Sequence, residues 1–279
     1  MRSVLITGGT GSFGQAFVRE ALKHCERVCV FSRDELKQAE MRATLTDSRL
    51  RWFIGDVRDQ ARLRRAMEGC DTVVHAAALK RVEVGEFDAP EMVKTNILGT
   101  MNLIEAAHDA AVQKVIALSS DKASVPVSAY GATKLLMERL VACAQVARGK
   151  DGPRFATVRC GNFAGSRGSI IPTWRQMLAS GAVSLPVTDR RCTRFIMRIE
   201  DAVREVFALE QGMVGGELVI PNLPAFRVVD LAETLGAAWH EVGLRPGERL
   251  HEQMQPGVSS EDGPFLTNNE LWAICSAIA

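Results

Sequence analysis

A glycine-rich turn near the N-terminus constrains the fold of this chain more than any other feature. Residues 4–7 form a short apolar run, glycines follow at 8, 11 and 14, and residues 15–23 have helical spacing. A strand, a glycine turn and a helix in this order let backbone N–H groups approach a pyrophosphate at the N-terminus of the helix. A tight turn without a ligand is the alternative, because a glycine spacing alone is weak evidence. The pattern predicts a dinucleotide site at Gly8, Thr10, Gly11, Ser12, Phe13 and Gly14.

Apolar runs alternate with helical segments along the rest of the chain. The runs cover residues 27–31, 51–54, 72–75, 114–118, 155–159 and 217–220, and helices are predicted at 91–107, 129–146, 171–179, 199–209, 228–242 and 268–278. This alternation predicts an α/β fold with a doubly wound parallel Rossmann sheet, whose ligands lie at the carboxyl ends of the strands. We expect residues 1–159 to form an NAD(P)-binding domain and residues 160–279 mainly a smaller substrate-binding part. Segments near 193–210 and 217–220 are expected to return to the first domain.

Polar side chains follow the second and third predicted strands, where a dinucleotide fold holds the adenosine. Ser32 and Arg33 come directly after the strand and Asp34 and Glu35 only later, which favours the 2′-phosphate of NADP over the free ribose of NAD. Asp34 could equally be a helix N-cap, with Arg33 a solvated charge. Asp56 could bind the adenine amino group or cap a helix. Alanines after the fourth strand would let the backbone approach a flat ligand, or simply pack.

The only tyrosine of the chain, Tyr130, lies close to a cluster of reactive side chains. The fifth predicted strand would deliver Ser120, Asp121 and Lys122 to its carboxyl end. Tyr130 and Lys134 are four residues apart and share one face of the next helix. A phenol, two amines, a carboxylate and a hydroxyl therefore meet at one place. We predict that these groups carry the chemistry.

The composition excludes several classes of partner. Lys and Arg number 34 against 33 Asp and Glu, so no basic surface for nucleic acid or an anionic membrane is expected. No apolar stretch approaches the roughly 18 residues that span a bilayer, and the histidines lack metal-ligand spacing. Seven cysteines without a CxxC pair, and a first segment typical of a strand rather than a signal peptide, favour a reduced cytoplasmic setting.

Nine ordered motifs then identify a family. The chain contains TGGTGSFG, FSRDELKQAEM, FIGDVRD, HAAALK, SSDKA, YGATK, GNFAGSRGSIIP, TRF and GLRPGERLHE, between residue 3 and about 252. It resembles the extended short-chain dehydrogenase/reductase family, and within it the inverting UDP-N-acetylglucosamine 4,6-dehydratases. The resemblance implies a UDP-N-acetylglucosamine substrate and a tightly bound, recycled NADP, with NAD possible. It also implies homo-oligomers that form through the helices at 91–107 and 129–146.

The resemblance assigns a role to each member of the reactive cluster. Tyr130 as phenolate removes the 4-hydroxyl proton of the sugar, and Ser120 hydrogen-bonds O4. Lys134 holds the nicotinamide ribose and lowers the pKa of Tyr130. Lys122 removes the C5 proton and Asp121 protonates the departing 6-hydroxyl. Lys122 must then be neutral, which burial beside Lys134 would promote.

The remaining positions follow from the same motifs. Cofactor positions are the glycine loop with Ser32, Arg33, Asp34, Glu35, Lys37, Asp56, Val57, Ala76, Ala78, Lys80, Tyr130 and Lys134. Positions for the nucleotide sugar are Lys80, Asn162, Phe163, Ala164, Gly165, Ser166, Arg167, Ile170, Thr188, Arg194 and Arg245. Arg194 could instead be a structural ion-pair partner. No metal site is expected.

Several positions depart from the family pattern. Cys160, Ser128, Arg81 and Glu83 replace residues usual in the family, and the C-terminal region is shorter. A different nucleotide sugar in an antibiotic or polysaccharide pathway is therefore one alternative. A 4- or 5-epimerase of the same fold is a second, although a simple 4-epimerase needs no C5 base. A non-catalytic NADP-binding sensor is a third, which the intact reactive cluster disfavours.

Overall fold

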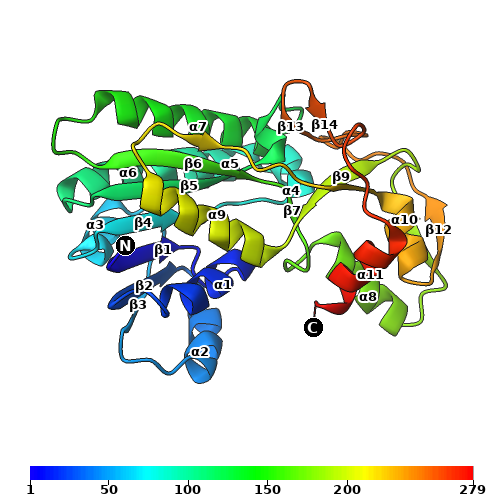
Figure 1. The fold of residues 1–279 in the computed structure, drawn as a ribbon, viewed down its shortest axis with the longest axis horizontal. Coiled ribbons are helices and arrows are strands. Elements are labelled where there is room, and N and C mark those ends of the chain that lie inside the picture. Colours follow the sequence, from blue (N-terminus) through cyan, green and yellow to red (C-terminus); the bar gives the residue numbers. More distant parts are fainter. Residues whose placement is uncertain (279) are drawn as a thin grey trace.

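Seven parallel strands form the centre of the molecule. The computed structural model describes residues 1–278. The main sheet contains β1 (Ser3–Thr7), β2 (Arg27–Ser32), β3 (Leu50–Ile54), β4 (Thr72–His75), β5 (Lys114–Ser120), β6 (Arg154–Cys160) and β10 (Leu218–Val219), in the order β10-β6-β5-β4-β1-β2-β3 (Figure 1). From β1 the chain adds β2 and β3 on one side of the sheet and then β4, β5 and β6 on the other, so the topological switch point lies between β1 and β4. A doubly wound sheet has its ligand crevice at this point.

Alternating side chains of these strands fill two cores, one on each face. Val4 and Ile6 pack in the first core with α1 (Ser12–Ala21), α2 (Glu35–Thr44) and α9 (Ile199–Gly212). Leu5 packs in the second core with α3 (Gln60–Met67), α6 (Gly99–Asp109) and α7 (Ala129–Ala147). Helices on both faces explain why the strands are apolar throughout. Figure 1 shows α9 beside α1, so a late segment of the chain completes the first layer.

The crossover from β4 to β5 contains a π-helical turn. After α4 (Val82–Phe87) come α5 (Ala89–Met92), the π-helical turn η1 (Val93–Leu98) and α6. Fully buried Asn96 exchanges two hydrogen bonds with the backbone of Leu79, 2.8 and 2.9 Å long, and donates to Thr133 Oγ1 at 3.0 Å. The turn therefore fixes the loop after β4 against α7.

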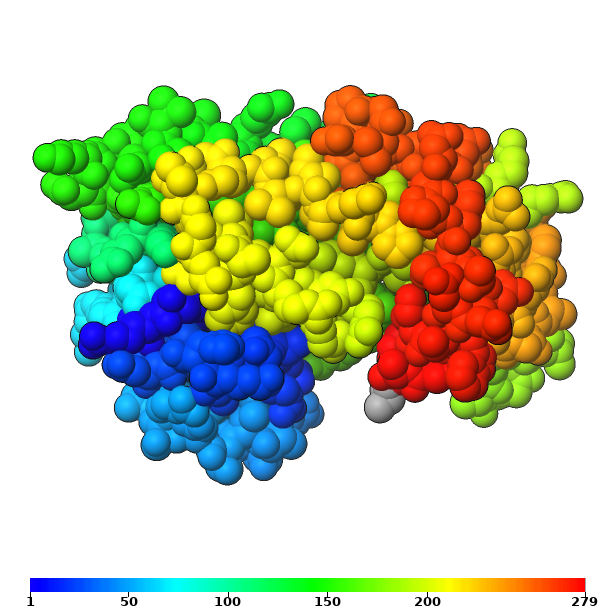
Figure 2. Space-filling model, in the orientation of Figure 1, coloured from blue at the N-terminus to red at the C-terminus, as the bar shows by residue number. Residues whose placement is uncertain are grey.

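A third core holds the smaller part of the molecule together. Its small sheets contain β7 (Asn162–Phe163), β9 (Thr193–Met197) and β11 (Ala225–Arg227), then β8 (Ser184–Val187) with β12 (Ala238–Glu241), and β13 (Gln253–Gln255) with β14 (Val258–Ser259). Helices α8 (Ile170–Ala179), α10 (Val228–Thr234) and α11 (Asn268–Ser276) pack around them through Trp174, Leu231 and Leu271. Figure 2 shows the last residues on one side of the molecule and the N-terminal third on the other.

The predicted fold class and all seven predicted strands are confirmed. The predicted helix at 228–242 is wrong beyond Thr234: Gly236 has a φ of +73°, and residues 238–241 pair in parallel with β8. Strand pairing there overrides the local pattern. Of the returning segments, α9 and β10 join the large layers and β9 joins a small sheet. The domain boundary at residue 160 stays a prediction. None of the helices among residues 1–278 is long and apolar enough to cross a membrane.

Candidate active site

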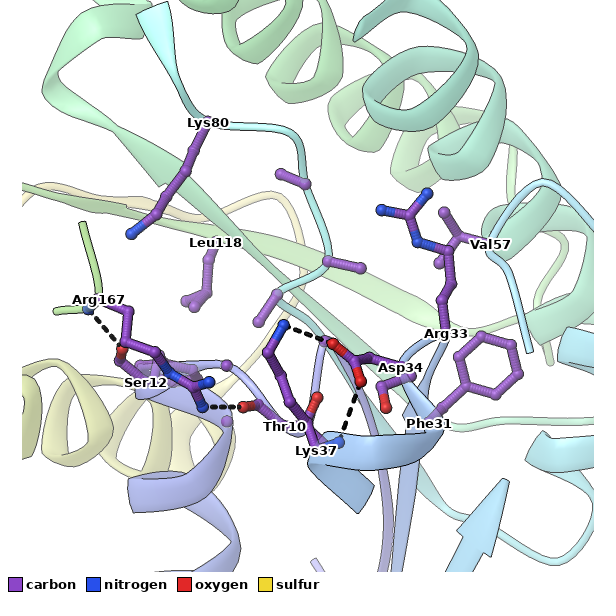
Figure 3. Close-up of a pocket in the computed structure, with 18 of the residues that line it drawn as sticks. Thr10, Ser12, Phe31, Arg33, Asp34, Lys37, Val57, Lys80, Leu118 and Arg167 are labelled. Carbon is purple, nitrogen blue, oxygen red and sulfur yellow. Dashed lines mark hydrogen bonds and ion pairs between the residues drawn. The ribbon is translucent and has the colours of Figure 1, made fainter. Parts of the chain in front are cut away.

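A cavity of about 510 Å³ lies over the glycine turn at the switch point of the sheet (Figure 3). The predicted cofactor residues Gly8, Thr10, Gly11, Ser12, Phe13, Gly14, Ser32, Arg33, Asp34, Lys37, Val57, Ala76, Ala78 and Lys80 line it. A Cβ at Gly14 would lie 2.5 Å from Gly8 O, and one at Gly8 2.9 Å from Ala77 N. Only glycine can therefore occupy these two positions, because any side chain would collide with the backbone. A glycine turn packed this closely fits a dinucleotide phosphate.

The part of this cavity beyond β2, where the adenosine was predicted, carries two cations beside a capped helix. Asp34 accepts from Lys37 N and pairs with Lys37 Nζ at 2.5 Å, so the alternative role of Asp34 as a helix N-cap is realised. Arg33 Nη1 lies 3.4 Å from Asp56 Oδ2. The carboxylate of Asp34 therefore already has partners, and Arg33 and Lys37 present their cations at the cavity (Figure 3). Neither Asp56 nor Glu35 lines the cavity itself.

The loop after β7 reaches across to the glycine turn. Arg167 N donates to Ser12 Oγ at 3.0 Å, and Arg167 Nη2 donates to Thr10 O at 3.0 Å (Figure 3). Arg167, predicted for the nucleotide sugar, borders both this cavity and the next one. Ala164 lines a third cavity, whereas Gly165 lines none and packs against Ile278.

Three of the five members of the reactive cluster line a second cavity of about 580 Å³. Ser120 lines it from the end of β5, Lys122 from the turn that follows β5, and Tyr130 from α7, whereas Asp121 and Lys134 do not line it. Cys160, Asn162 and Phe163 line it from β6 and β7. Cations at Lys80, Arg81, Arg167, Arg194 and Arg245 surround the same space. A neighbouring cavity of about 310 Å³ continues toward α8 and includes Ile170 and Thr188.

The short 3₁₀ turn η2 (Asp121–Ala123) fixes Asp121 and Lys122 directly after β5. Ser120 Oγ donates to Asp121 Oδ1 at 2.8 Å, and Lys122 N donates to the same oxygen at 2.9 Å. Lys122 Nζ lies 3.2 Å from Asp121 Oδ1, 3.2 Å from Glu252 Oε1 and 3.3 Å from Asn162 Oδ1. The amine is therefore held at the cavity wall by three oxygen acceptors.

The charge of Lys122 differs from the prediction. Burial lowers its pKa, but the carboxylates of Asp121 and Glu252 outweigh burial and raise the pKa above its ordinary value. Lys134 does not promote a neutral Lys122, because Lys134 Nζ instead donates to Leu118 O at 2.7 Å. That expectation is wrong: the sequence pairs Lys122 with Asp121, but it does not reveal that Glu252 faces the same amine. Burial raises the pKa of Asp121, whose side chain is 1 % exposed.

Tyr130 and Lys134 lie on the buried face of α7, as predicted. Burial raises the pKa of Tyr130 to about 12, with Lys122 opposing, and lowers the pKa of Lys134 to about 8. The cation that favours the phenolate here is thus Lys122 rather than Lys134. Ser128 caps α7 by accepting from Gly131 N at 3.1 Å. A Cβ at Gly131 would lie 2.3 Å from Lys122 O, so glycine allows α7 to contact η2.

Two acids of the GLRPGERLHE motif, Glu248 and Glu252, lie at the site, although the sequence predicted no role for them. Glu248 accepts from Arg194 Nη2 at 2.7 Å and from Thr188 Oγ1 at 3.1 Å, which gives Arg194 the ion-pair role left open above. Glu252 contacts Lys122, and Arg245 pairs with Glu83. The motif was the only sequence signal for these acids. Within residues 1–278, no group of three or more His, Cys, Asp or Glu side chains could hold a metal ion.

Comparison with known proteins agrees with this geometry. The sequence model of a family described as "Polysaccharide biosynthesis protein" matches residues 4–265. The inverting UDP-N-acetylglucosamine 4,6-dehydratase of Campylobacter jejuni is 44% identical over 265 residues, which cover 94% of this chain and 78% of that one. The chain belongs to the extended short-chain dehydrogenase/reductase family.

Other members of this dehydrogenase/reductase family are also similar to the chain. The UDP-glucose 4-epimerase of Rickettsia prowazekii is 39% identical over 273 residues, covering 94% of this chain and 79% of its own. The structure of Pen from Bacillus thuringiensis has a TM-score of 0.94 and 32% identity, covering 99% and 97% of the two chains. DesIV, a dTDP-glucose 4,6-dehydratase from Streptomyces venezuelae with NAD bound, has a TM-score of 0.84 and 25% identity, covering 98% and 96%. The relatives thus include nucleotide-sugar dehydratases and epimerases, and the DesIV structure contains NAD.

Proposed function

We propose that this chain is a UDP-N-acetylglucosamine 4,6-dehydratase that inverts C5 and forms a 4-keto-6-deoxy-L-hexosamine nucleotide. The observation that carries the proposal is the Asp121–Lys122 pair: Lys122 lines the cavity that Tyr130 also lines, and buried Asp121 lies 3.2 Å from its amine. A simple 4-epimerase needs the tyrosine but no acid and base for elimination. The similarity to a relative with this printed activity supports the substrate.

The first step is oxidation at C4. Tyr130, as the phenolate, takes the proton of the 4-hydroxyl, and Ser120 hydrogen-bonds O4. The residues that line the first cavity would hold the dinucleotide, whose nicotinamide would supply the hydride acceptor for C4 and, after elimination, the hydride donor for C6. The 4-ketone makes the C5 proton acidic, which is why oxidation comes first.

Elimination then needs a base and an acid at once. Lys122 takes the proton from C5, the electron pair forms the C5–C6 double bond, and the 6-hydroxyl leaves as water with a proton from Asp121. Protonation of C5 on the opposite face gives the L configuration.

The pair can create both required forms by one proton transfer. Lys122 Nζ and Asp121 Oδ1 are 3.2 Å apart, and burial raises the pKa of Asp121. A proton that moves from the amine to the carboxylate leaves a neutral base and a protonated acid. This transfer replaces Lys134 as the reason why Lys122 can act as a base, and the active pair carries one proton in total.

Residues around both cavities fit the two ligands. The cations at Lys80, Arg81, Arg167 and Arg245 suit a UDP diphosphate. We assign the lining of the first cavity to the dinucleotide. Tyr130 would lie between nicotinamide and sugar, and Lys134, buried behind it, would reach the ribose.

One experiment tests the activity. The protein is incubated with UDP-N-acetylglucosamine in deuterated water, and the product is followed by NMR. We expect a 6-deoxy-4-keto sugar with deuterium at C5. A 4-epimer would refute the dehydratase, and no turnover of any nucleotide sugar would favour the non-catalytic sensor.

A variant tests the role of Lys122. Lys122→Ala should lower the elimination rate by about 100-fold or more, since general base catalysis contributes about 10²–10⁴-fold. Cofactor binding should stay intact. Lys150→Ala, which changes an exposed lysine remote from the cavities, serves as the control. Loss of cofactor binding in Lys122→Ala would refute the assigned role.

A different substrate is the main alternative. Arg81, Glu83 and Cys160 depart from the family pattern and line the second cavity of about 580 Å³, which we assign to the sugar and call the sugar cavity. A UDP-glucose 4-epimerase is also 39% identical to this chain. The NMR experiment repeated with UDP-glucose and dTDP-glucose separates these possibilities. Preferred dehydration of one of them would change the substrate but keep the reaction.

We propose NADP as the cofactor, because Arg33 and Lys37 face the adenosine end while Asp34 is already engaged. Arg33→Ala should weaken NADP binding by about 10-fold or more, as expected for a lost charged hydrogen bond worth about 1.5–3 kcal/mol, and should leave NAD binding nearly unchanged. Titration of the cofactor-free protein with each dinucleotide measures this. Equal losses for both would argue against 2′-phosphate recognition.

We also propose homo-oligomerisation through the crossover helices and α7. Leu98, Met101 and Leu136 are 47%, 45% and 47% exposed on η1, α6 and α7, which pack against one another, so these elements offer apolar side chains to a second copy. The seven cysteines are all free, which supports the proposed reduced cytoplasmic setting.

A further inference from the structure

One buried carboxylate at the site has no part in the reaction described above. Glu252 is 3% exposed, lines the sugar cavity and precedes β13. Among the described residues, its Oε2 has no hydrogen-bond partner. A buried carboxylate is costly unless it is paired, so the Lys122 amine, the cation nearest to it at 3.2 Å, must be important for its position.

The backbone of Glu252 is fixed independently of the site. Glu252 N donates to Ser260 Oγ at 2.9 Å, and Ser260 N donates to Glu252 O at 2.8 Å. Ser260 Oγ is also 2.7 Å from Thr193 Oγ1 on β9. The carboxylate therefore reaches Lys122 from a rigid support.

Lys122 Nζ has three acceptors from three separate segments: Asp121 on η2, Asn162 on β7 and Glu252 before β13. An ammonium has three donors, so these acceptors match it completely. Asp121 has a second role as the acid. When Asp121 takes the proton, Glu252 and Asn162 remain to hold the amine in place.

Glu252 remains ionised in this arrangement. Burial raises its pKa, but the charges of Lys122 and Arg194 outweigh burial and lower it. Arg194 Nε is 4.0 Å from Glu252 Oε1. Asp121, and not Glu252, is thus the group that accepts the proton of Lys122.

We infer that Glu252 is a positioning residue, which holds the Lys122 amine at the sugar cavity while Asp121 exchanges its proton. The inference rests on the proposed dehydratase function and adds a residue to it. It explains why a motif some 120 residues after the Asp-Lys pair belongs to the same site.

Two substitutions separate position from charge. Glu252→Ala removes the support and should slow elimination by about 10- to 100-fold, because a displacement of about 1 Å can cost about 100-fold. Glu252→Gln keeps an oxygen acceptor and should recover most of that loss. Reduction of bound cofactor by the substrate in a single turnover uses Tyr130 and not Lys122 as its base. This step should fall by less than elimination in both variants, because Lys122 affects it only through the charge that it places near Tyr130.

The pH profile gives a readout that a merely structural role would not change. The active pair carries one proton, so activity falls when Lys122 loses that proton at high pH. Removing the nearby negative charge lowers the pKa of Lys122, and the alkaline limb should move to lower pH by about 1–3 units in Glu252→Gln. Glu261→Gln, which changes an exposed acid of the same segment, is the control and should leave the alkaline limb at the wild-type pH.

Lys122 can also be tested without turnover. Its reaction with acetic anhydride at a fixed alkaline pH, quantified by mass spectrometry, should be about 10-fold faster in Glu252→Gln than in wild type, since one pKa unit is tenfold in the neutral fraction. Unchanged reactivity, or an elimination rate that equals wild type in Glu252→Ala, would overturn the inference. If the wild-type protein dehydrates no nucleotide sugar, the proposed dehydratase function is wrong. The labelling rates would still show whether Glu252 lowers the reactivity of Lys122.

Discussion

At the scale of single residues, the site depends on where buried charges are placed. Lys122 meets two carboxylates and stays cationic, whereas Lys134 meets a backbone carbonyl and has its pKa lowered to about 8. The same side-chain type thus has opposite shifts within one cluster. The partner, and not burial alone, determines the sign.

His75 provides a prediction about stability and pH. Its ring lies 2.8 Å from Thr7 Oγ1 and 3.2 Å from Thr100 Oγ1, and burial lowers its pKa from 6.5 to about 3. Below pH 6.5 the unfolded chain takes up a proton that the folded protein excludes. The contribution of the neutral His75 ring to the unfolding free energy is therefore complete above pH 6.5. It is lost as the pH falls toward 3, by up to about 1.4 kcal/mol per pH unit.

His75→Gln should make the unfolding free energy fall less steeply over that window. Urea unfolding at a series of pH values measures the slope. His24→Gln, which changes an exposed histidine in the turn after α1, should keep the wild-type slope. Identical slopes for wild type and His75→Gln would contradict the neutral buried ring.

At the scale of elements, the contact between η2 and α7 aligns the two halves of the reactive cluster. Gly131→Ala would place a methyl group 2.3 Å from Lys122 O, and neither backbone can move alone. We expect the unfolding free energy to fall by about 1–3 kcal/mol and kcat to fall by about 100-fold through displacement of Tyr130. Thermal unfolding and the dehydration assay measure both effects.

Gly149→Ala is the matched control for this substitution. No atom lies within 4 Å of the added Cβ at Gly149. Its activity should equal wild type. A fully active Gly131→Ala would mean that α7 tolerates a shift away from η2.

At the scale of the whole molecule, the exposed apolar residues of the crossover helices predict the assembly. Leu98→Arg should convert the proposed oligomer toward monomer, because an unpaired charge in an interface costs about 3 kcal/mol or more, about 100-fold in Kd. Sedimentation at several protein concentrations measures the association. Val183→Arg, at an 89% exposed residue of the smaller part, should not change it. A monomeric wild type would refute the oligomer.

The amino-acid pattern was enough to predict the α/β layers, the seven strands and the place of the reactive cluster at a carboxyl end of the sheet. That cluster is Ser120, Asp121, Lys122, Tyr130 and Lys134. These features depend on residue periods and on neighbours within a few positions, which a linear pattern contains. The parallel sheet then requires that strand ends meet.

Only the tertiary structure decided what surrounds those side chains. It brought Glu252 to Lys122 and so reversed the expected shift of that amine, laid Arg167 across the glycine turn, and paired residues 238–241 as a strand where a helix was predicted. Each of these depends on contacts between segments far apart in the chain, and charge and pairing energies fall steeply with distance. No local pattern contains those distances, so the electrostatics of the site followed from the fold.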